Sequence, residues 1–247
     1  DIQRCLQESG ITLSTVSITK ILKEEGFARL PRRADDERPG EKRFVIGSMR
    51  CLKILSARDG TKKFLWQLED KHSIETVLIH EKSRRTLCLS TQVGCKFRCP
   101  FCVSGFKGFI RQLTAAEIVG QILEVRRASG VEATNIVMMG IGEPLDNFEN
   151  LAGAIRIINH PDGLRIGARK ITISTCGLVP GILKLEQLGL QIELSVSLHA
   201  TTDELRDRLV PVNRKYNLEK LLSACREYFK ATDRVITLEY ALIEGMN

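Results

Sequence analysis

The stretch RRTLCLSTQVGCKFRCPFC, residues 84–102, decides how the rest of the sequence is interpreted. It contains a short apolar segment, TLCLST at residues 86–91, whose length and composition predict a buried β-strand. Three cysteines follow within eight positions, Cys95, Cys99 and Cys102. Three thiols are an odd number for disulfides and one fewer than the ligands of a closed structural zinc site. The segment therefore predicts a strand followed by a metal-binding loop with room for a further ligand.

Strand-like and helix-like segments alternate after this loop. A helix is expected to begin at Thr114, because Thr114 and Glu117 form a capping-box pattern. Further strands are expected at residues 135–139, 170–175, 192–200 and 235–243. Two further helices are expected near residues 148–158 and 179–188. Two more are expected to begin after a cap at Thr201 and after Asn217. Apolar strands that alternate with amphipathic helices predict an α/β fold, a parallel sheet covered by helices in a full or partial barrel. Five such strands are expected from residue 86 onward.

The residues before this core divide into two parts. Residues 47–85 are expected to be β-rich, with a hairpin around the Asp-Gly turn of RDGT and a further strand in IETVLIH. Residues 1–46 are expected to hold a short helix capped by Ser14 or Thr15, followed by a charged linker that contains proline. Two interpretations of residues 1–46 stay open: a helix-turn-helix that resembles the DNA-binding end of some transposases, or a helical appendage without a nucleic-acid role.

Composition limits the class of protein but not its function. The chain has 247 residues, 43% of them hydrophobic and 27% charged, as in ordinary globular proteins. It contains no apolar run long enough for a membrane span and no leader-like start, so we expect a cytoplasmic protein with reduced cysteines. The formal charge of +7 is compatible with a polyanionic partner, but also with a merely solvated basic surface.

The cysteine spacing favours an iron–sulfur cluster over zinc. Closely spaced thiolates bind zinc or the iron of a cluster. A structural zinc site needs four ligands, and the nearest other cysteine, Cys88, lies seven residues upstream within the expected strand. Three thiolates on a four-iron cluster instead leave one iron free to take a small molecule. Structural zinc and three unrelated thiols remain as alternatives.

Polar residues follow three of the expected strands at the point where each strand ends. These residues are Gly142-Glu143-Pro144, Ser174-Thr175 and Ser197-Leu198-His199. In α/β sheets and barrels, ligands bind at the C-terminal ends of the strands. Taken singly, a Gly-Glu-Pro segment is only a tight turn and His199 is a buried core histidine. Together on one rim, they predict a binding site beside the cysteine loop.

These motifs resemble one family closely. The arrangement C-x3-C-x2-C after a barrel strand is the signature of radical S-adenosylmethionine (SAM) enzymes. The blocks MMGIGEPLDN, KITISTCG, SVSLHA and VPVNRKYN, together with the cysteine stretch, are similar to the RlmN and Cfr methyltransferases over residues 48–247. The resemblance implies a truncated radical SAM core at residues 86–247, a [4Fe–4S] cluster on Cys95, Cys99 and Cys102, and SAM as cofactor. It favours the RlmN branch, which methylates carbon 2 of an adenosine in 23S rRNA and tRNA; the Cfr branch, which methylates carbon 8, is the alternative.

The resemblance also implies roles for single residues. SAM contacts are expected from Gly142, Glu143, Ser174, Ser197, Leu198 and His199. In this family a methylated cysteine gives a radical that forms a covalent adduct with the RNA; Cys88 matches the cysteine that resolves it, and Glu75 matches the proton acceptor. Without the resemblance, Glu75 is an exposed strand carboxylate and Cys88 a small buried hydrophobic residue. Four other cysteines are expected to be structural: Cys5, Cys51, Cys176 and Cys225.

The expected partners follow from the same resemblance. RNA is expected to bind the basic residues that flank the rim, which are Lys82, Arg84, Arg85, Lys107 and Arg111. The resemblance also implies an electron donor such as flavodoxin. We expect a monomer. The family continues past the equivalent of Asn247 with another SAM-contact asparagine and the methylated cysteine, so we expect this chain to bind the cluster yet not to complete RNA methylation. Residues 1–46 do not resemble the family's accessory domain. Alternatives are another radical SAM activity, such as an activating enzyme, a DNA-binding module joined to a degraded enzyme, or a zinc-binding structural protein.

Overall fold

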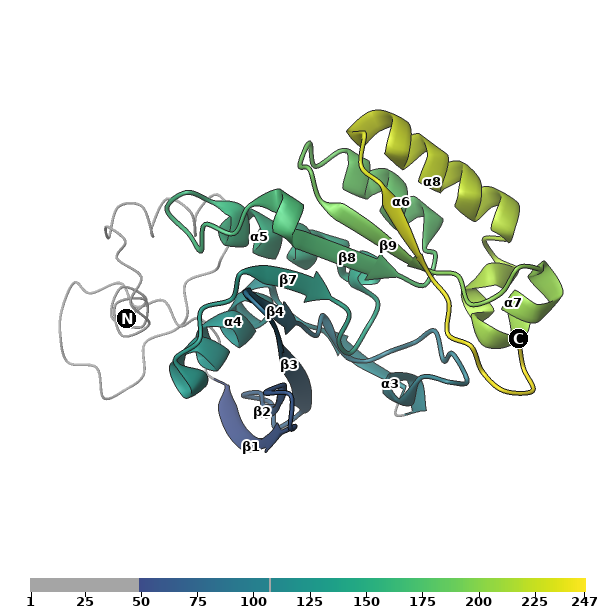
Figure 1. The fold of residues 1–247 in the computed structure, drawn as a ribbon. Coiled ribbons are helices and arrows are strands. Elements are labelled where there is room, and N and C mark those ends of the chain that lie inside the picture. Colours follow the sequence, from purple (N-terminus) through teal and green to yellow (C-terminus); the bar gives the residue numbers. More distant parts are fainter. Residues whose placement is uncertain (1–48, 107) are drawn as a thin grey trace.

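The computed structural model describes residues 49–106 and 108–247 (Figure 1). The helix and linker expected in residues 1–46 lie outside the described residues. Eight of the described strands form one sheet in the order β1-β2-β3-β4-β7-β8-β9-β10, and β5 and β6 form a separate pair. The strands are β1 (Arg50–Ser56), β2 (Lys62–Gln67), β3 (Ser73–Glu81), β4 (Arg84–Cys88), β5 (Gln92–Gly94), β6 (Phe109–Gln112), β7 (Asn135–Met138), β8 (Ile171–Thr175), β9 (Glu193–Ser197) and β10 (Ile236–Glu239).

The helices lie between these strands in the chain. The α-helices are α3 (Val103–Phe106), α4 (Ala115–Ser129), α5 (Phe148–Asn159), α6 (Val179–Glu186), α7 (Asp203–Leu209) and α8 (Leu218–Thr232), and the 3-10 helices are η1 (Pro144–Asn147), η2 (Ala168–Lys170) and η3 (Pro211–Arg214). No helix in the described part of the chain is long and apolar enough to cross a membrane.

The sheet changes character at β4. Strands β1 to β4 pair antiparallel, whereas β4, β7, β8, β9 and β10 pair parallel. The predicted α/β class and the five parallel strands are therefore confirmed, and the β-rich region continues the same sheet instead of standing apart from it. Because the parallel strands share a direction, their C-terminal ends meet at one edge, and Figure 1 shows the arrowheads of β8 and β9 pointing toward the end of the molecule that carries α3.

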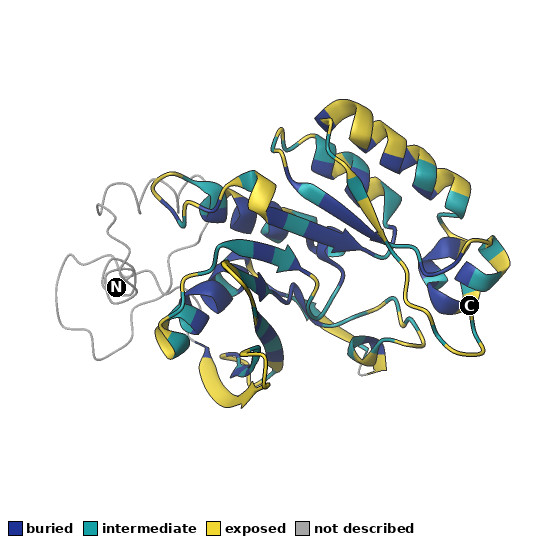
Figure 2. Ribbon diagram, viewed as in Figure 1, coloured by how far each residue is buried: buried dark blue, intermediate teal, exposed yellow. Residues whose placement is uncertain are grey.

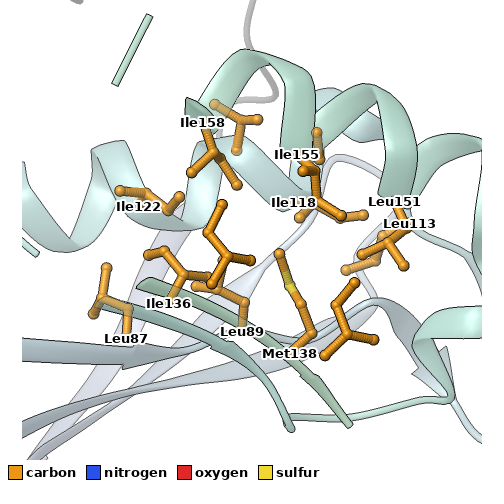
Figure 3. Close-up of a cluster of buried hydrophobic side chains, with 14 of the residues drawn as sticks. Leu87, Leu89, Leu113, Ile118, Ile122, Ile136, Met138, Leu151, Ile155 and Ile158 are labelled. Carbon is orange, nitrogen blue, oxygen red and sulfur yellow. The ribbon is translucent and has the colours of Figure 1, made fainter. Parts of the chain in front are cut away.

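One face of the parallel sheet is apolar and packs against helices. Along β4 and β7, Leu87, Ile136 and Met138 are fully buried, while the residues between them are partly exposed. Figure 3 shows these side chains and Leu89 packed against residues of α4 and α5, among them Ile118, Ile122, Leu151, Ile155 and Ile158. This alternation leaves the other face of the same strands for different side chains.

Local signals in the sequence set several element boundaries. The Asp-Gly hairpin between β1 and β2 is confirmed, with Gly60 at a φ of 87° that favours glycine. The capping box of α4 is confirmed as well, because Thr114 and Glu117 each bond the other's backbone N–H. The expected cap at Thr201 is wrong by one residue: Thr202 is extended and its hydroxyl accepts from the Leu205 N–H at 3.4 Å, so α7 begins at Asp203.

Burial distinguishes the first strand from the middle of the sheet. Every residue of β1 is exposed, whereas the middle strands β7, β8 and β9 carry most of the buried positions (Figure 2). The accessory strands are nevertheless joined to the core by a buried polar chain. Trp66 donates to the Thr76 hydroxyl at 3.0 Å, and that hydroxyl donates to Gln121 of α4 at 2.8 Å. These bonds fix β2 and β3 against the helix that covers the parallel sheet.

Candidate functional site

The three predicted cysteines lie in one loop at the C-terminal edge of the sheet. The loop begins with β5, contains Cys95, Cys99 and Cys102, and returns through α3 to β6. The Cys95 N–H donates to the Gly108 carbonyl at 3.2 Å, and the Cys102 N–H donates to the Cys99 carbonyl at 2.9 Å. The β5–β6 pair, which was not predicted from the sequence, thus folds the loop back so that all three thiols belong to one compact segment.

A glycine makes this fold-back possible. Gly94 has a φ of 75°, and a Cβ atom there would lie 1.8 Å from the Gly108 carbonyl oxygen. No other residue fits this close approach without moving the backbone. The residue that immediately precedes Cys95 is therefore fixed as glycine by the turn that carries the thiols.

The three thiols influence one another electrostatically. The pKa of Cys99 is raised to about 12, first by burial and then by Cys102 and Cys95. Burial is also the main cause that raises the pKa of Cys95, followed by Glu143 and Cys102 among others. Cys102 thus disfavours the thiolates of Cys95 and Cys99, and Cys95 disfavours that of Cys99. A positively charged metal centre reverses this, because coordinating thiols lose their protons.

The thiols of Cys95, Cys99 and Cys102 are the type of ligand that holds an iron–sulfur cluster, in which each iron takes its own cysteine. Three thiolates are one fewer than the four ligands of a closed structural zinc site. Within residues 49–106 and 108–247, no group of three or more His, Cys, Asp or Glu side chains is placed to hold a single metal ion. The loop therefore supplies ligands of the kind that a cluster needs.

The predicted polar rim lies next to this loop. The Phe101 ring packs edge-on against the His199 ring, with 4.8 Å between their centroids. Phe97 and Cys99 pack against a small apolar cluster that includes Ala200 and Leu209, next to the end of β9. The loop and the end of β9 therefore form one surface.

Gly142 and Glu143 form a clamp between strands. The Glu143 carboxylate is buried and accepts the N–H groups of Leu145 at 3.1 Å and Cys176 at 2.8 Å. The Glu143 N–H in turn donates to Gln92 of β5 at 2.8 Å, and Gly142, at a φ of 109°, lies so close that a Cβ would meet the Gln92 Cβ at 2.5 Å. Burial raises the pKa of the Glu143 carboxyl. Each carboxylate oxygen accepts one of these N–H groups and keeps acceptor capacity for a further donor, so the expected contact of Glu143 with a ligand stays a prediction.

Ser174 and Ser197 converge on a residue that sequence reasoning missed. The Glu239 carboxylate of β10 accepts hydrogen bonds from the hydroxyls of Ser174 at 3.4 Å, Ser195 at 2.7 Å and Ser197 at 3.1 Å. The Glu239 carbonyl accepts the N–H groups of Leu198 and His199 at 3.0 and 3.2 Å. Four of the predicted rim residues are thus held by one residue. Polar residues at alternate positions of β9, in a strand otherwise apolar, were the signal that could have found this network.

A buried arginine holds the same strand ends from the helix side. Arg206 of α7 is fully buried and donates to the carbonyls of Cys176, Ser197 and Leu198 at 2.8, 3.1 and 3.1 Å. It also donates to the Asn213 side chain at 2.9 Å. Because burial disfavours its charge, the pKa of Arg206 is lowered. This role was not predictable from the helical pattern, since an arginine in an amphipathic helix ordinarily faces solvent.

Cys88 and Glu75 lie on the face of the sheet opposite α4. Cys88 pairs with Val77 of β3, and Glu75 stands two residues away on that strand, so both side chains point to the same face. Burial raises the pKa of Cys88 to about 11. Glu75 forms an ion pair with Lys63 at 3.2 Å and its side chain is 40% exposed. Among the hydrogen bonds of the described residues, none joins the two side chains.

The remaining cysteines differ in their surroundings. Cys225 is buried in the core, and Cys176 packs against the cluster of Ala200 and Leu209, as expected for structural residues. Cys51 is exposed on β1, so the expectation of a structural role there is wrong. Cys5 lies outside the described residues.

The basic residues expected beside the rim are elsewhere. Lys82, Arg84 and Arg85 stand at the start of β4, whereas the cysteine loop follows its end, so this expectation is wrong for all three. Arg111 lies near the loop but pairs with Asp70 at 2.5 Å and Glu117 at 2.8 Å. Lys107 lies outside the described residues. The basic residues and the cysteines are close in sequence, but β4 lies between them and places them at opposite edges of the sheet.

Comparison with known proteins agrees with this geometry. Residues 89–247 match the model of the radical SAM superfamily. The chain is 49% identical over 204 residues to a probable dual-specificity RNA methyltransferase RlmN of Desulforudis audaxviator, covering 82% of this chain and 64% of that protein. It is 52% identical over 192 residues to the dual-specificity RNA methyltransferase RlmN of Pelobacter propionicus, covering 76% of this chain and 54% of that protein.

A solved structure shows the same similarity in three dimensions. The crystal structure of a radical SAM methyltransferase from Sphaerobacter thermophilus superposes with a TM-score of 0.78 at 46% identity, and the match covers 81% of this chain and 60% of that one. The chain thus spans less than two thirds of the length of these relatives.

Proposed function

Because this chain belongs to the radical SAM superfamily, we propose that it is the cofactor-binding part of an RNA methyltransferase that acts on adenosine in 23S rRNA and tRNA, at carbon 2 of the base. The observation that carries the proposal is a loop of three thiols beside a rim of polar strand ends, in a chain about half identical to dual-specificity RNA methyltransferases. Adenine carbon 2 is a poor centre for polar methyl transfer, so a radical cofactor is the chemistry that this substrate needs.

In this proposal Cys95, Cys99 and Cys102 hold a [4Fe–4S] cluster. A bound cluster of this kind, with one iron free of protein ligands, supplies the electron that cleaves SAM. The protein provides the remaining functions: it fixes the three thiols through the Gly94 turn, and it closes the loop against the end of β9 through the Phe101–His199 contact.

The rim provides hydrogen-bond acceptors for SAM. Since Ser174 and Ser197 donate their protons to Glu239, their hydroxyl oxygens remain free only to accept. Such acceptors suit the ribose hydroxyls or the ammonium group of SAM, all of which are donors. Among the described residues, no donor is recorded for the Gly142 carbonyl, which is a further acceptor at this rim. We assign these roles to Gly142, Ser174 and Ser197, and contacts from the neighbouring Leu198 and His199.

Cys88 and Glu75 act, in this proposal, on the RNA adduct. The Cys88 thiol is protonated at neutral pH because its pKa is about 11. Its attack on the adduct therefore requires loss of the thiol proton, which goes to a base or to solvent. The Cys88 thiolate would then bond to the sulfur of the protein–RNA thioether and form a disulfide, while the bond from that sulfur to the new carbon breaks and the carbon takes up a proton. Glu75 is assigned as the acceptor of the proton that leaves the adenine carbon. Its position on the same face of the sheet as Cys88 supports this assignment.

Anaerobic reconstitution tests the cofactor part of the proposal. The chain, incubated with iron, sulfide and reductant, is expected to gain about four irons and to convert SAM into methionine and 5′-deoxyadenosine. Cys99→Ala is expected to lose both properties, and Cys51→Ala, which removes an exposed cysteine outside the loop, to keep them. Zinc instead of iron in the purified protein, or equal iron content in the two variants, would contradict the proposal.

Product analysis tests the substrate part. The full-length protein, supplied with SAM, reductant and an unmodified 23S rRNA fragment, is expected to yield 2-methyladenosine after digestion to nucleosides. Recovery of 8-methyladenosine would replace the carbon 2 assignment by carbon 8. Cleavage of SAM without any methylated nucleoside would reject an RNA substrate.

A further inference from the structure

A cleft of about 550 Å³ lies at the edge of the sheet opposite the cysteine loop. The start of β4, the C-terminal half of α4, the segment before β7 and the segment between α5 and β8 form its walls. Neither the cofactor site nor the proposed RNA chemistry uses this region. We call it the basic cleft, after the charged residues that line it: Arg85, Arg126, Glu132, Arg165 and Lys170.

The charge of the basic cleft is strongly one-sided. Four cationic side chains line it against a single carboxylate. That carboxylate, Glu132, pairs with Arg126, and the Glu132 carbonyl accepts from Arg85 Nε at 2.7 Å. Glu132 and its backbone therefore hold two arginines in place while balancing only one positive charge.

The other two cations are available to a ligand. Arg165 and Lys170 are exposed at the cleft. Arg165 uses only its Nε, which donates to the Pro161 carbonyl at 2.7 Å; within residues 49–106 and 108–247, no acceptor is recorded for its other guanidinium nitrogens or for the Lys170 Nζ. The backbone at Arg165 is left-handed, with a φ of 58°, a conformation that an arginine rarely adopts. Glycine and asparagine are the residues usually found in this left-handed conformation.

Apolar residues also line the cleft. Ile122, Leu123, Leu164 and Ile166 contribute to its lining. A ligand that fits this lining carries negative charges together with some less polar surface. The sugar–phosphate backbone of a nucleic acid has this character, since phosphates alternate with riboses. Arginine in particular presents several donors in a planar fork that matches phosphate oxygens.

We propose that the basic cleft binds the sugar–phosphate backbone of the RNA substrate, as a second contact far from the reacting adenosine. This inference rests on the proposed function, because the RNA substrate is itself part of that proposal. Near the cysteine loop, Arg111 is paired with Asp70 and Glu117, whereas Arg98 is exposed and no acceptor is recorded for its side chain in the described part of the chain. The basic cleft adds a second set of available cations at the opposite edge of the sheet. The five residues of β4 separate the two edges by about 16 Å, a distance that a folded RNA spans.

Salt-dependent binding tests the proposal. The chain is titrated with a labelled RNA stem-loop at several salt concentrations, as wild type, as the double variant Arg165→Gln/Lys170→Gln, and as the control Lys220→Gln/Arg226→Gln. The control removes the same charge from exposed positions of α8, which does not line the cleft. The cleft variant is expected to bind more weakly, with a slope of log affinity against log salt smaller by about 1.5 to 2, and the control to match wild type. Equal slopes in the two variants would overturn the proposal.

Footprinting gives a second, direct measurement. RNA is expected to protect Lys170, but not Lys220, from an amine-acylating reagent. Protection of Lys170 by adenosine monophosphate at the same phosphate concentration would assign the cleft to free nucleotides and overturn the RNA proposal.

The two proposals fail in different ways. A wild-type chain that binds RNA, with a cleft variant that binds equally well, rejects the cleft alone. A wild-type chain that cleaves SAM but binds no RNA rejects the RNA part of the proposed function, and the cleft assignment with it.

Discussion

The two faces of the parallel sheet use the same strands for different purposes. The face toward the helices carries aliphatic side chains such as Ile136, Ile173 and Val196, all fully buried. The opposite face carries Cys88, Ser174, Ser195 and Ser197 at the intervening positions, and Glu239 of β10 accepts hydrogen bonds from the serine hydroxyls of β8 and β9. Because side chains alternate along a strand, residues that stabilise the core and residues that line the candidate site lie one position apart.

The largest effect on stability is expected from changing Arg206 of α7, which bonds the ends of the strands that carry the polar face. Arg206→Met removes four hydrogen bonds and leaves the carbonyls of Cys176, Ser197 and Leu198 without this partner. The free energy of unfolding, measured by urea titration, is expected to fall by at least about 4 kcal/mol. Arg226→Met, on the exposed side of α8, should stay within about 0.5 kcal/mol of wild type. Equal stability of the two variants would show that Arg206 is not structural.

Two substitutions at adjacent residues of β8 compare the contributions of the two faces to the free energy of unfolding. Ile173→Ala removes a fully buried side chain from the helix face, and a loss of roughly 3 kcal/mol in unfolding free energy is expected. Thr172→Ala changes the opposite face, where the side chain is only partly buried, and less than about 1 kcal/mol is expected. Similar losses in thermal or urea unfolding would mean that the faces do not differ in their contribution to stability.

Glu239→Gln is expected to affect ligand binding more than stability. The amide nitrogen of glutamine donates instead of accepting, so Ser174 and Ser197 can no longer direct all of their protons toward residue 239. The affinity for SAM, measured by calorimetry on the reconstituted protein, is expected to fall about tenfold, or about 1.4 kcal/mol. Glu239→Asp, which keeps a carboxylate, should recover part of the loss, and Glu244→Gln, an exposed neighbour, should bind as wild type. Loss of stability in Glu239→Gln without loss of affinity would restrict Glu239 to a structural role.

The smallest effect concerns pH. Burial, and less strongly Arg206, lower the pKa of His199 below its usual 6.5, although Glu239 opposes the shift, and neutral His199 accepts the Ala241 N–H at 3.1 Å. The unfolded chain takes up a proton near pH 6.5 while the folded chain does not. The contribution of His199 to the free energy of unfolding is therefore fully present above pH 6.5 and is lost as the pH falls below it. At one pH unit below 6.5, the loss is at most about 1.4 kcal/mol. The drop in melting temperature between about pH 7.5 and about pH 5.5 should be smaller in His199→Gln than in wild type; an equal drop would contradict this.

The sequence alone determined the strand–helix alternation, the Asp-Gly hairpin, the α4 capping box and the cysteine loop. These features depend on residues close together in the chain, whose spacing and turn preferences act locally. Even the resemblance that pointed to Cys95, Cys99 and Cys102 used short contiguous blocks.

Tertiary structure alone decided which polar groups meet. Glu239 lies more than forty positions from Ser195 in the chain, and only the parallel pairing of β9 and β10 brings them together. Arg206 is buried because the ends of β8 and β9 converge on it, and Arg84 and Arg85 are remote from the thiols because β4 separates them. Local sequence patterns contain no information on such partners, since a side chain's environment is set by strands and helices that are distant in the chain.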